Sequence, residues 1–138
     1  MERSSHKSWI GTVILVGVVY FLIGRGSTLP HDNVGTWRLA AWVASAGVAA
    51  AHIGYERFQL DRSPLVTALH AALAVALGAF LLAIAATINA VMVVANPPYG
   101  RYLLALVLWP IFTAVPAFLV SLAIASVLAR LPAKRVAK

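Results

Sequence analysis

The sequence predicts an all-α membrane protein: a bundle of four transmembrane helices that run alternately up and down. Its composition supports this first, because 62% of the 138 residues are hydrophobic and only 11% are charged. A soluble domain is usually about half apolar and about a quarter charged. A soluble domain of this length still exposes roughly a third of the surface that its unfolded chain exposes, which is too much to keep so many apolar side chains from water. The second observation is that the apolar residues form four runs with short polar connections between them.

These runs give the expected spans of a single domain over residues 1–138: about 9–24, 37–58, 65–95 and 102–131. The first run corresponds to only roughly 24 Å of helix, whereas the third, at roughly 46 Å, exceeds the hydrocarbon core and has to tilt or project from it. The fourth contains proline at two internal positions. Proline inside a helix removes a hydrogen bond, so we expect a bend there.

The connections carry turn-forming residues. Residues 25–36 combine Gly, Pro, Asp and Asn and are expected to form a loop. Residues 59–63 predict a tight turn, with Ser63 as the N-cap of the next helix and Pro64 at its first position. Residues 96–100, with two consecutive prolines and a glycine, are expected to break the chain before the last helix.

The distribution of basic residues predicts the orientation, since cytoplasmic loops are enriched in Lys and Arg. Three of the 11 fall on one side, at Arg25, Arg38 and Arg101, and the others on the opposite side, at Arg3, Lys7, Arg57, Arg62, Arg130, Lys134, Arg135 and Lys138. We therefore expect a multi-pass protein of the inner (plasma) membrane with both termini in the cytoplasm. Basic residues at helix ends fit anionic lipid headgroups, so the bilayer is the expected partner and nucleic acid is not.

A basic stretch before a short apolar run is also typical of a signal peptide. Residues 24–27 read Gly-Arg-Gly-Ser and contain no Ala-x-Ala-like cleavage site. We expect the first segment to be retained as a span.

The candidate site consists of three ionisable residues beside the 59–63 turn, namely His52, Glu56 and His70. The two histidines lie almost symmetrically about Asp61. In an antiparallel hairpin they should therefore sit at similar depth, roughly 9 to 13 Å from the turn. If their faces match, the side chains should approach to within about 8 to 10 Å or closer. Glu56 follows His52 by four residues and shares its helical face.

Ionisable groups inside a membrane span are costly and suggest function. Two imidazoles and a carboxylate could form a proton relay or hold a transition metal, with His52 and His70 as the ligands. Two histidines could also bind a haem iron axially. The structural alternative is that both histidines hydrogen-bond backbone, water or each other, and that Glu56 pairs with Arg57, Arg62 or a lipid headgroup. We favour the structural alternative, with no cofactor.

Other polar residues give weaker signals. The second run carries a stripe at spacings of three and four residues that we expect to face the bundle, formed by Arg38, Trp42, Ser45, Ala49, His52 and Glu56. The third run has a seam of mostly small residues that predicts close helix packing, formed by Thr67, Ala71, Ala74, Gly78, Ala85 and Asn89. Arg38 could bind an anion and Asn89 could hydrogen-bond across helices, which makes them secondary candidates. A further row of small residues, Ala46, Ala50 and Gly54, also predicts packing.

The chain contains no recognisable catalytic motif: no H-E-x-x-H, no G-x-S-x-G and no phosphate-binding glycine-rich loop. It has no cysteine, which excludes thiol chemistry and disulfides. We therefore do not expect an enzyme and assign no catalytic residue. The leading hypothesis is a non-catalytic membrane subunit or interaction protein that binds copies of itself or other membrane subunits. The alternatives are an oligomeric transporter or channel coupled to protons or a cation through His52, Glu56 and His70, and a haem- or metal-binding redox protein.

Overall fold

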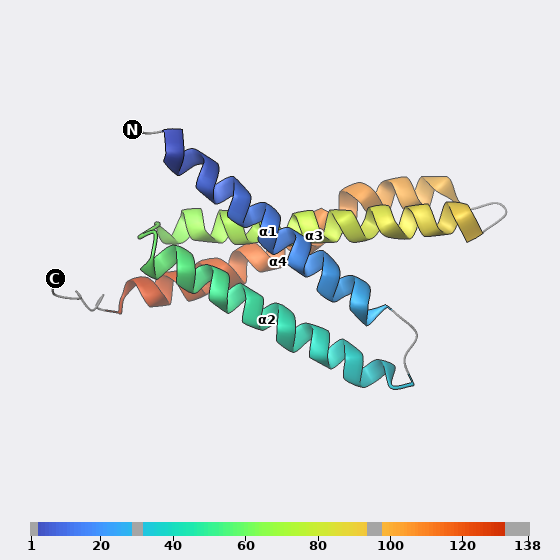
Figure 1. Cartoon of the computed structure of the whole chain (residues 1–138), viewed down its shortest axis with the longest axis horizontal. Coiled ribbons are helices and arrows are strands. Elements are labelled where there is room, and N and C mark those ends of the chain that lie inside the picture. Colours follow the sequence, from blue (N-terminus) through green and yellow to red (C-terminus); the bar gives the residue numbers. More distant parts are fainter. Residues whose placement is uncertain (1–2, 29–31, 94–97, 132–138) are drawn as a thin grey trace.

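The computed structural model consists of four helices joined by short connections (Figure 1). It describes residues 3–28, 32–93 and 98–131, with only the backbone for residues 3–8. The helices are α1 (Arg3–Ser27), α2 (Val34–Phe58), α3 (Pro64–Val93) and α4 (Tyr99–Ala129). The predicted all-helical fold with four helices is therefore confirmed.

The helix bounds differ from the apolar runs mainly at the ends. α1 and α2 each extend into the expected loop at residues 25–36, because helical hydrogen bonding continues past the last apolar residue. α4 begins at Tyr99, inside the segment expected to break the chain, while residues 94–97 lie outside the described part. α3 begins at Pro64, as predicted.

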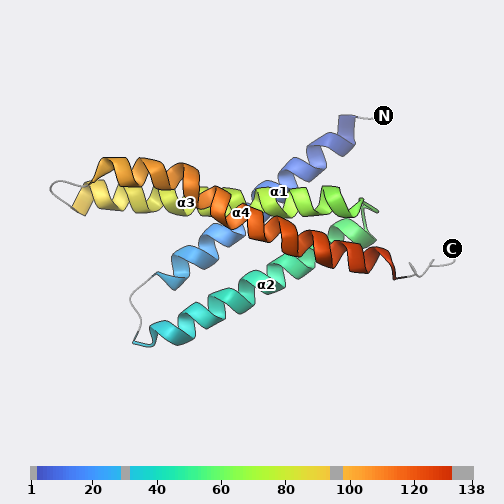
Figure 2. The ribbon, with the colours of Figure 1, turned by 180° about the vertical axis from the view of Figure 1, so that it is seen from behind.

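α3 is the central element of the fold. α1 crosses over it when the molecule is viewed from the front (Figure 1), and α4 lies over it when the molecule is viewed from behind (Figure 2). Its buried side chains are almost all small and include seven alanines: Ala68, Ala71, Ala72, Ala74, Ala79, Ala83 and Ala90. Small side chains let helix backbones approach closely, which explains why the most alanine-rich helix is the one in the middle.

The crossing of α1 and α3 depends on two glycines. A Cβ atom on Gly78 would lie 2.7 Å from Cβ of Tyr20 and 3.0 Å from the carbonyl oxygen of Gly17. A Cβ atom on Gly17 would lie 2.8 Å from Cδ2 of Leu77. The backbones therefore touch at a point where no larger residue fits.

The small-residue seam predicted on α3 is found over its first half only. Thr67, Ala71, Ala74 and Gly78 are buried, but Ala85 is half-buried and Asn89 is exposed. Beyond the crossing point α1 moves away from α3, so the far end of α3 has only α4 beside it (Figure 1). The expectation that Asn89 belongs to the packed seam is wrong for this reason.

α4 contains Pro110 and Pro116 but continues as one helix. Its two halves run in different directions (Figure 2), which agrees with the predicted bend. The hydroxyl of Thr113, between the prolines, donates to the carbonyl oxygens of Trp109 and Pro110, each at 3.0 Å. Such bonds to the preceding turn accompany helix bending.

Among the described residues, three segments are long and apolar enough to cross a membrane: Trp9–Ser27, Pro64–Val93 and Tyr99–Ala129. α2 does not meet this criterion, because its arginines, His52 and Glu56 lower its mean hydropathy. Large apolar side chains are also exposed on all four helices. Soluble monomers rarely expose apolar surface so widely, so these features suggest association with a membrane.

Candidate functional site

The turn between α2 and α3 positions the candidate site. The Gln59 amide donates to the carbonyl oxygen of Tyr55, and the Arg62 amide donates to that of Glu56, so the end of α2 is tied to the turn. The predicted N-cap is found: Oγ of Ser63 accepts from the Val66 amide at 3.4 Å. Asp61 lies in the turn with φ 47°, in the left-handed region. This tight connection holds the end of α2 beside the start of α3.

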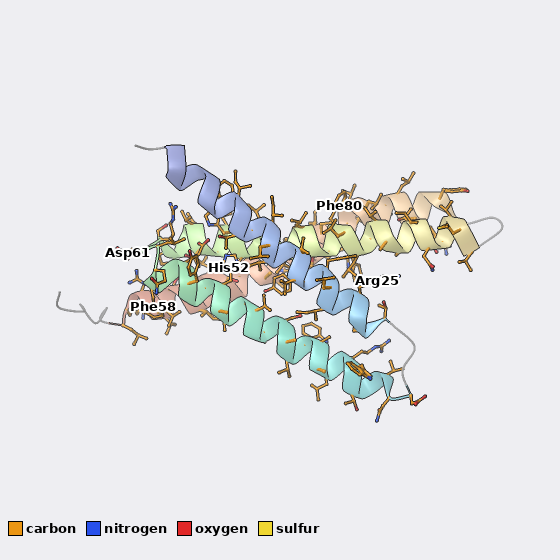
Figure 3. All side chains as sticks on the ribbon, in the orientation of Figure 1. Arg25, His52, Phe58, Asp61 and Phe80 are labelled. Atoms are coloured by element: carbon orange, nitrogen blue, oxygen red, sulfur yellow. The ribbon has the colours of Figure 1, made fainter. Side chains whose placement is uncertain are left out.

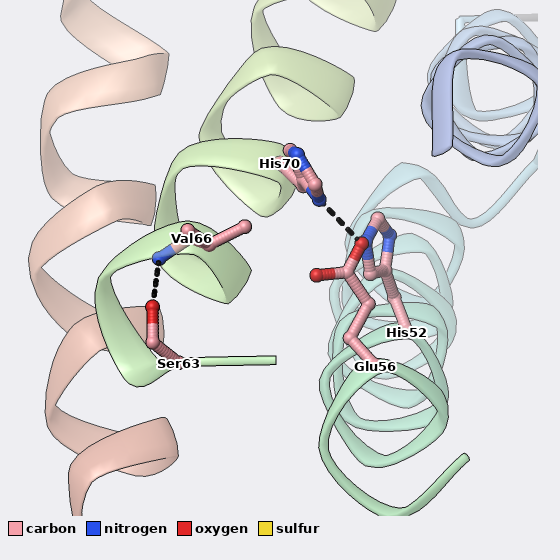
Figure 4. Close-up of polar contacts among 5 residues, drawn as sticks. All are labelled: His52, Glu56, Ser63, Val66 and His70. Carbon is pink, nitrogen blue, oxygen red and sulfur yellow. Dashed lines mark hydrogen bonds and ion pairs between the residues drawn. The ribbon is translucent and has the colours of Figure 1, made fainter. Parts of the chain in front are cut away.

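The structure brings His52, Glu56 and His70 together around one oxygen atom. Nδ1 of His70 lies 2.6 Å from Oε1 of Glu56, and Nε2 of His52 lies 3.4 Å from the same oxygen (Figure 4). The two ring nitrogens are therefore no farther apart than the sum of these contacts, so the predicted proximity of the two imidazoles is found. The sequence did not predict that Glu56 would lie between them.

All three side chains are shielded from solvent. The exposed fraction is 0% for Glu56, 4% for His52 and 8% for His70. His52 lies near the end of the molecule that carries Asp61 and Phe58, well away from Arg25 (Figure 3). A buried carboxylate is stable only when it is hydrogen-bonded, and here the two imidazoles supply the donors.

A fourth residue, Trp9 of α1, completes the site. Its ring stacks on His70 with a centroid separation of 4.8 Å and an interplanar angle of 2°. Trp9 was not among the candidate residues predicted from the sequence. The available signal was the position of Trp9 near the start of α1, since α1 and α3 begin at the same end of the molecule (Figure 1). The rotation of α1 that points the indole at the imidazole has no local sequence signal.

Neighbouring arginines do not pair with Glu56. Arg57 instead forms an ion pair with Asp61, Nη1 to Oδ1 at 2.9 Å, and the Asp61 side chain is 92% exposed. The alternative that Glu56 pairs with Arg57 or Arg62 is therefore not the arrangement found. The other structural alternative had the histidines bonded to backbone, water or each other, whereas the bonds found run to the Glu56 carboxylate.

The polar atoms of the cluster are not all satisfied. Among the described residues, five buried side-chain atoms at this junction have no hydrogen-bond partner: Nδ1 of His52, Oε2 of Glu56, Oγ1 of Thr67 and the Nε atoms of Arg57 and Arg62. If Nε2–H of His52 donates to Glu56, then Nδ1 of the same ring is left as an acceptor that faces no donor in the described part of the chain.

The geometry does not fit a haem or metal held between the two histidines. Such a centre would need both imidazoles to direct a lone pair at one ion, whereas here both contact the Glu56 oxygen between them. In the part of the chain that the structure describes, no three His, Cys, Asp or Glu side chains are placed to hold a metal ion.

The secondary candidates lie outside the cluster. Arg38 is exposed near the start of α2, and Asn89 is exposed near the end of α3. The α2 stripe faces the other helices only from its half-buried middle to Glu56, because Trp42 is 76% exposed. The expectation that the whole stripe faces the bundle is wrong, because α2 diverges from the other helices toward its N-terminus (Figure 1).

Comparison with known proteins adds no relative: no family model, no curated protein and no solved structure matches the chain.

Proposed function

We propose that the chain is a polytopic inner-membrane protein that crosses the bilayer four times, with both termini in the cytoplasm. Three long apolar helices support the crossing. The start of α1, the α2–α3 turn and the end of α4 lie at one end of the molecule (Figure 1), which is the end predicted to be cytoplasmic from its basic residues. In this arrangement α2 is the least apolar span and crosses beside protein rather than surrounded by lipid.

Site-specific labelling tests this orientation, and the natural absence of cysteine makes single-cysteine variants unambiguous. Asn33→Cys should react with a membrane-impermeant maleimide added to intact spheroplasts. Gln59→Cys should react only after the membrane is permeabilised. The opposite pattern would invert the orientation, and equal labelling of both sites would rule out four crossings.

The function we favour is that of a non-catalytic membrane subunit that binds another helix through α2. The observation behind this proposal is that α2 is not apolar enough to count as a membrane span by itself and yet leaves several large apolar side chains exposed. The small residues Ala46 and Ala50 are exposed, beside the exposed Trp42. A row of small residues on a membrane helix favours close contact with a second helix over contact with lipid.

Association should depend on this row. In nanodiscs or mild detergent, Ala46→Leu and Ala50→Leu should release bound subunits or reduce the oligomer to a monomer. The matched control Val120→Ala, at an exposed position of α4, should leave the assembly unchanged. A wild-type chain that is monomeric and partner-free in native membrane extracts would contradict the proposal. Glu56→Gln should not affect association, since Glu56 is buried away from this row.

Proton-coupled transport is the second candidate, supported by the buried Glu56 carboxylate between two titratable imidazoles. A relay would take up a proton on one imidazole, pass it through the carboxylate and release it from the other. Liposomes containing the wild-type protein should then dissipate a pH gradient faster than liposomes containing Glu56→Gln. Equal rates, at the level of protein-free liposomes, would remove this candidate.

A further inference from the structure

Two fully buried oxygen atoms at the α2–α3 junction have no hydrogen-bond partner among the described residues: Oε2 of Glu56 and Oγ1 of Thr67. Both residues have an exposed fraction of 0%. Burying a polar atom without a partner costs about 1–3 kcal/mol, so each of these two atoms calls for a partner.

The helix geometry places both residues where α2 meets the start of α3. Thr67 precedes His70 by three residues, so the two side chains share the face of α3 that meets α2. His70 is bonded to Oε1 of Glu56 at 2.6 Å, which fixes the carboxylate against this face. Figure 4 shows the other oxygen of Glu56 directed toward the first turns of α3, on the side away from His52.

The chemistry of the two atoms defines the ligand. An ionised carboxylate oxygen only accepts hydrogen bonds, whereas a threonine hydroxyl accepts and donates. One molecule that donates to the carboxylate oxygen and accepts from the hydroxyl would satisfy both. We propose that a water molecule binds between Glu56 and Thr67 as an integral part of the junction.

Water fits this position better than a metal cation. Sodium and calcium ions take several oxygen ligands, and only two side-chain oxygens are free here. The carboxylate also already accepts two imidazole hydrogen bonds, which offset its charge. A buried water, by contrast, needs only two to four polar partners.

The proposed water site lies close to the solvent-exposed turn between α2 and α3. The Thr67 amide donates to the carbonyl oxygen of Ser63 at 3.0 Å, and the Ser63 side chain is exposed at the turn. The water therefore lies about one helical turn from solvent, or roughly 5 Å along α3. This inference rests on neither proposed function, because a bound water would stabilise the junction in a subunit and in a transporter alike.

The proposal is tested by whether the substitution Thr67→Val raises or lowers the stability of the protein. Thr67→Val keeps the shape of the side chain and removes the hydroxyl. If the junction is dry, the variant replaces a costly buried hydroxyl with a methyl group and becomes more stable. If a water binds, the variant removes one of its partners, and the unfolding equilibrium constant in mild detergent should rise roughly ten-fold.

A direct readout accompanies the stability measurement. Amide protons around Thr67 should show cross-relaxation to a long-lived water in the wild type and in Thr67→Ser, which keeps the hydroxyl. The signal should be lost in Thr67→Val. Increased stability of Thr67→Val, or an unchanged water signal in that variant, would overturn the proposal. So would saturable stabilisation of the wild type by sodium chloride relative to choline chloride at equal ionic strength, since that result would assign the site to a cation.

Discussion

Nδ1 of His70 lies 2.6 Å from Oε1 of Glu56, although the two residues are 14 positions apart and on different helices. This contact joins α2 to α3 inside the protein, and Trp9 joins α1 to the same point by stacking on His70. A single buried carboxylate is thus the place where three helices meet.

Removing that carboxylate should weaken the junction. We expect Glu56→Ala to lower the free energy of unfolding by about 1.5–3 kcal/mol, because it deletes a charge-assisted hydrogen bond in a fully buried position. Asp61→Asn is the control: it breaks the exposed ion pair with Arg57 and should change stability by less than about 0.5 kcal/mol. Unfolding curves in mixed detergent micelles measure both, and equal effects would mean that the buried cluster does not hold the helices together.

The stacking of Trp9 on His70 should be visible by NMR. Ring currents of the indole shift the imidazole protons of His70 upfield, and Trp9→Leu should remove this shift. Trp42→Leu should leave it unchanged, because Trp42 is largely exposed on α2. Spectra with labelled histidine test the pair, and a His70 resonance that does not respond to Trp9→Leu would show that α1 does not reach the site.

The α1–α3 crossing should tolerate no added methyl group at Gly78. Gly78→Ala places a Cβ within 3.0 Å of the carbonyl oxygen of Gly17, which belongs to rigid helix backbone. We expect it to destabilise the protein by about 1–3 kcal/mol, as overpacking does. Gly47→Ala meets nothing within 4 Å and should instead stabilise α2 by up to about 1 kcal/mol. Thermal unfolding of the two variants should therefore shift in opposite directions.

The left-handed backbone at Asp61 should restrict which residues this position tolerates. At φ 47° most residues are strained, whereas Asn and Asp tolerate this conformation. Asp61→Ala should cost about 1 kcal/mol more than Asp61→Asn, since both remove the ion pair and only alanine resists the left-handed backbone. Equal stability of the two variants would place the turn in another conformation in solution.

Much of this architecture follows from sequence alone, because it depends on local rules. Apolar runs of sufficient length indicated four helices, and Ser63-Pro64 indicated where the third begins. The symmetric spacing of His52 and His70 about Asp61 placed them at equal depth, since the rise per residue is the same in every α-helix. The small residues of α3 indicated a packed seam, which is found as far as Gly78.

The tertiary structure decided what depends on how helices rotate and cross. The sequence cannot specify the rotation of α2 about its axis relative to α3, and this rotation places Glu56 between the two histidines. The crossing at Gly17 and Gly78 sets the direction of α1, which brings Trp9 onto His70 and leaves Asn89 uncovered. Hydrophobic periodicity reports that a face is buried; only packing between particular side chains determines which neighbour covers it.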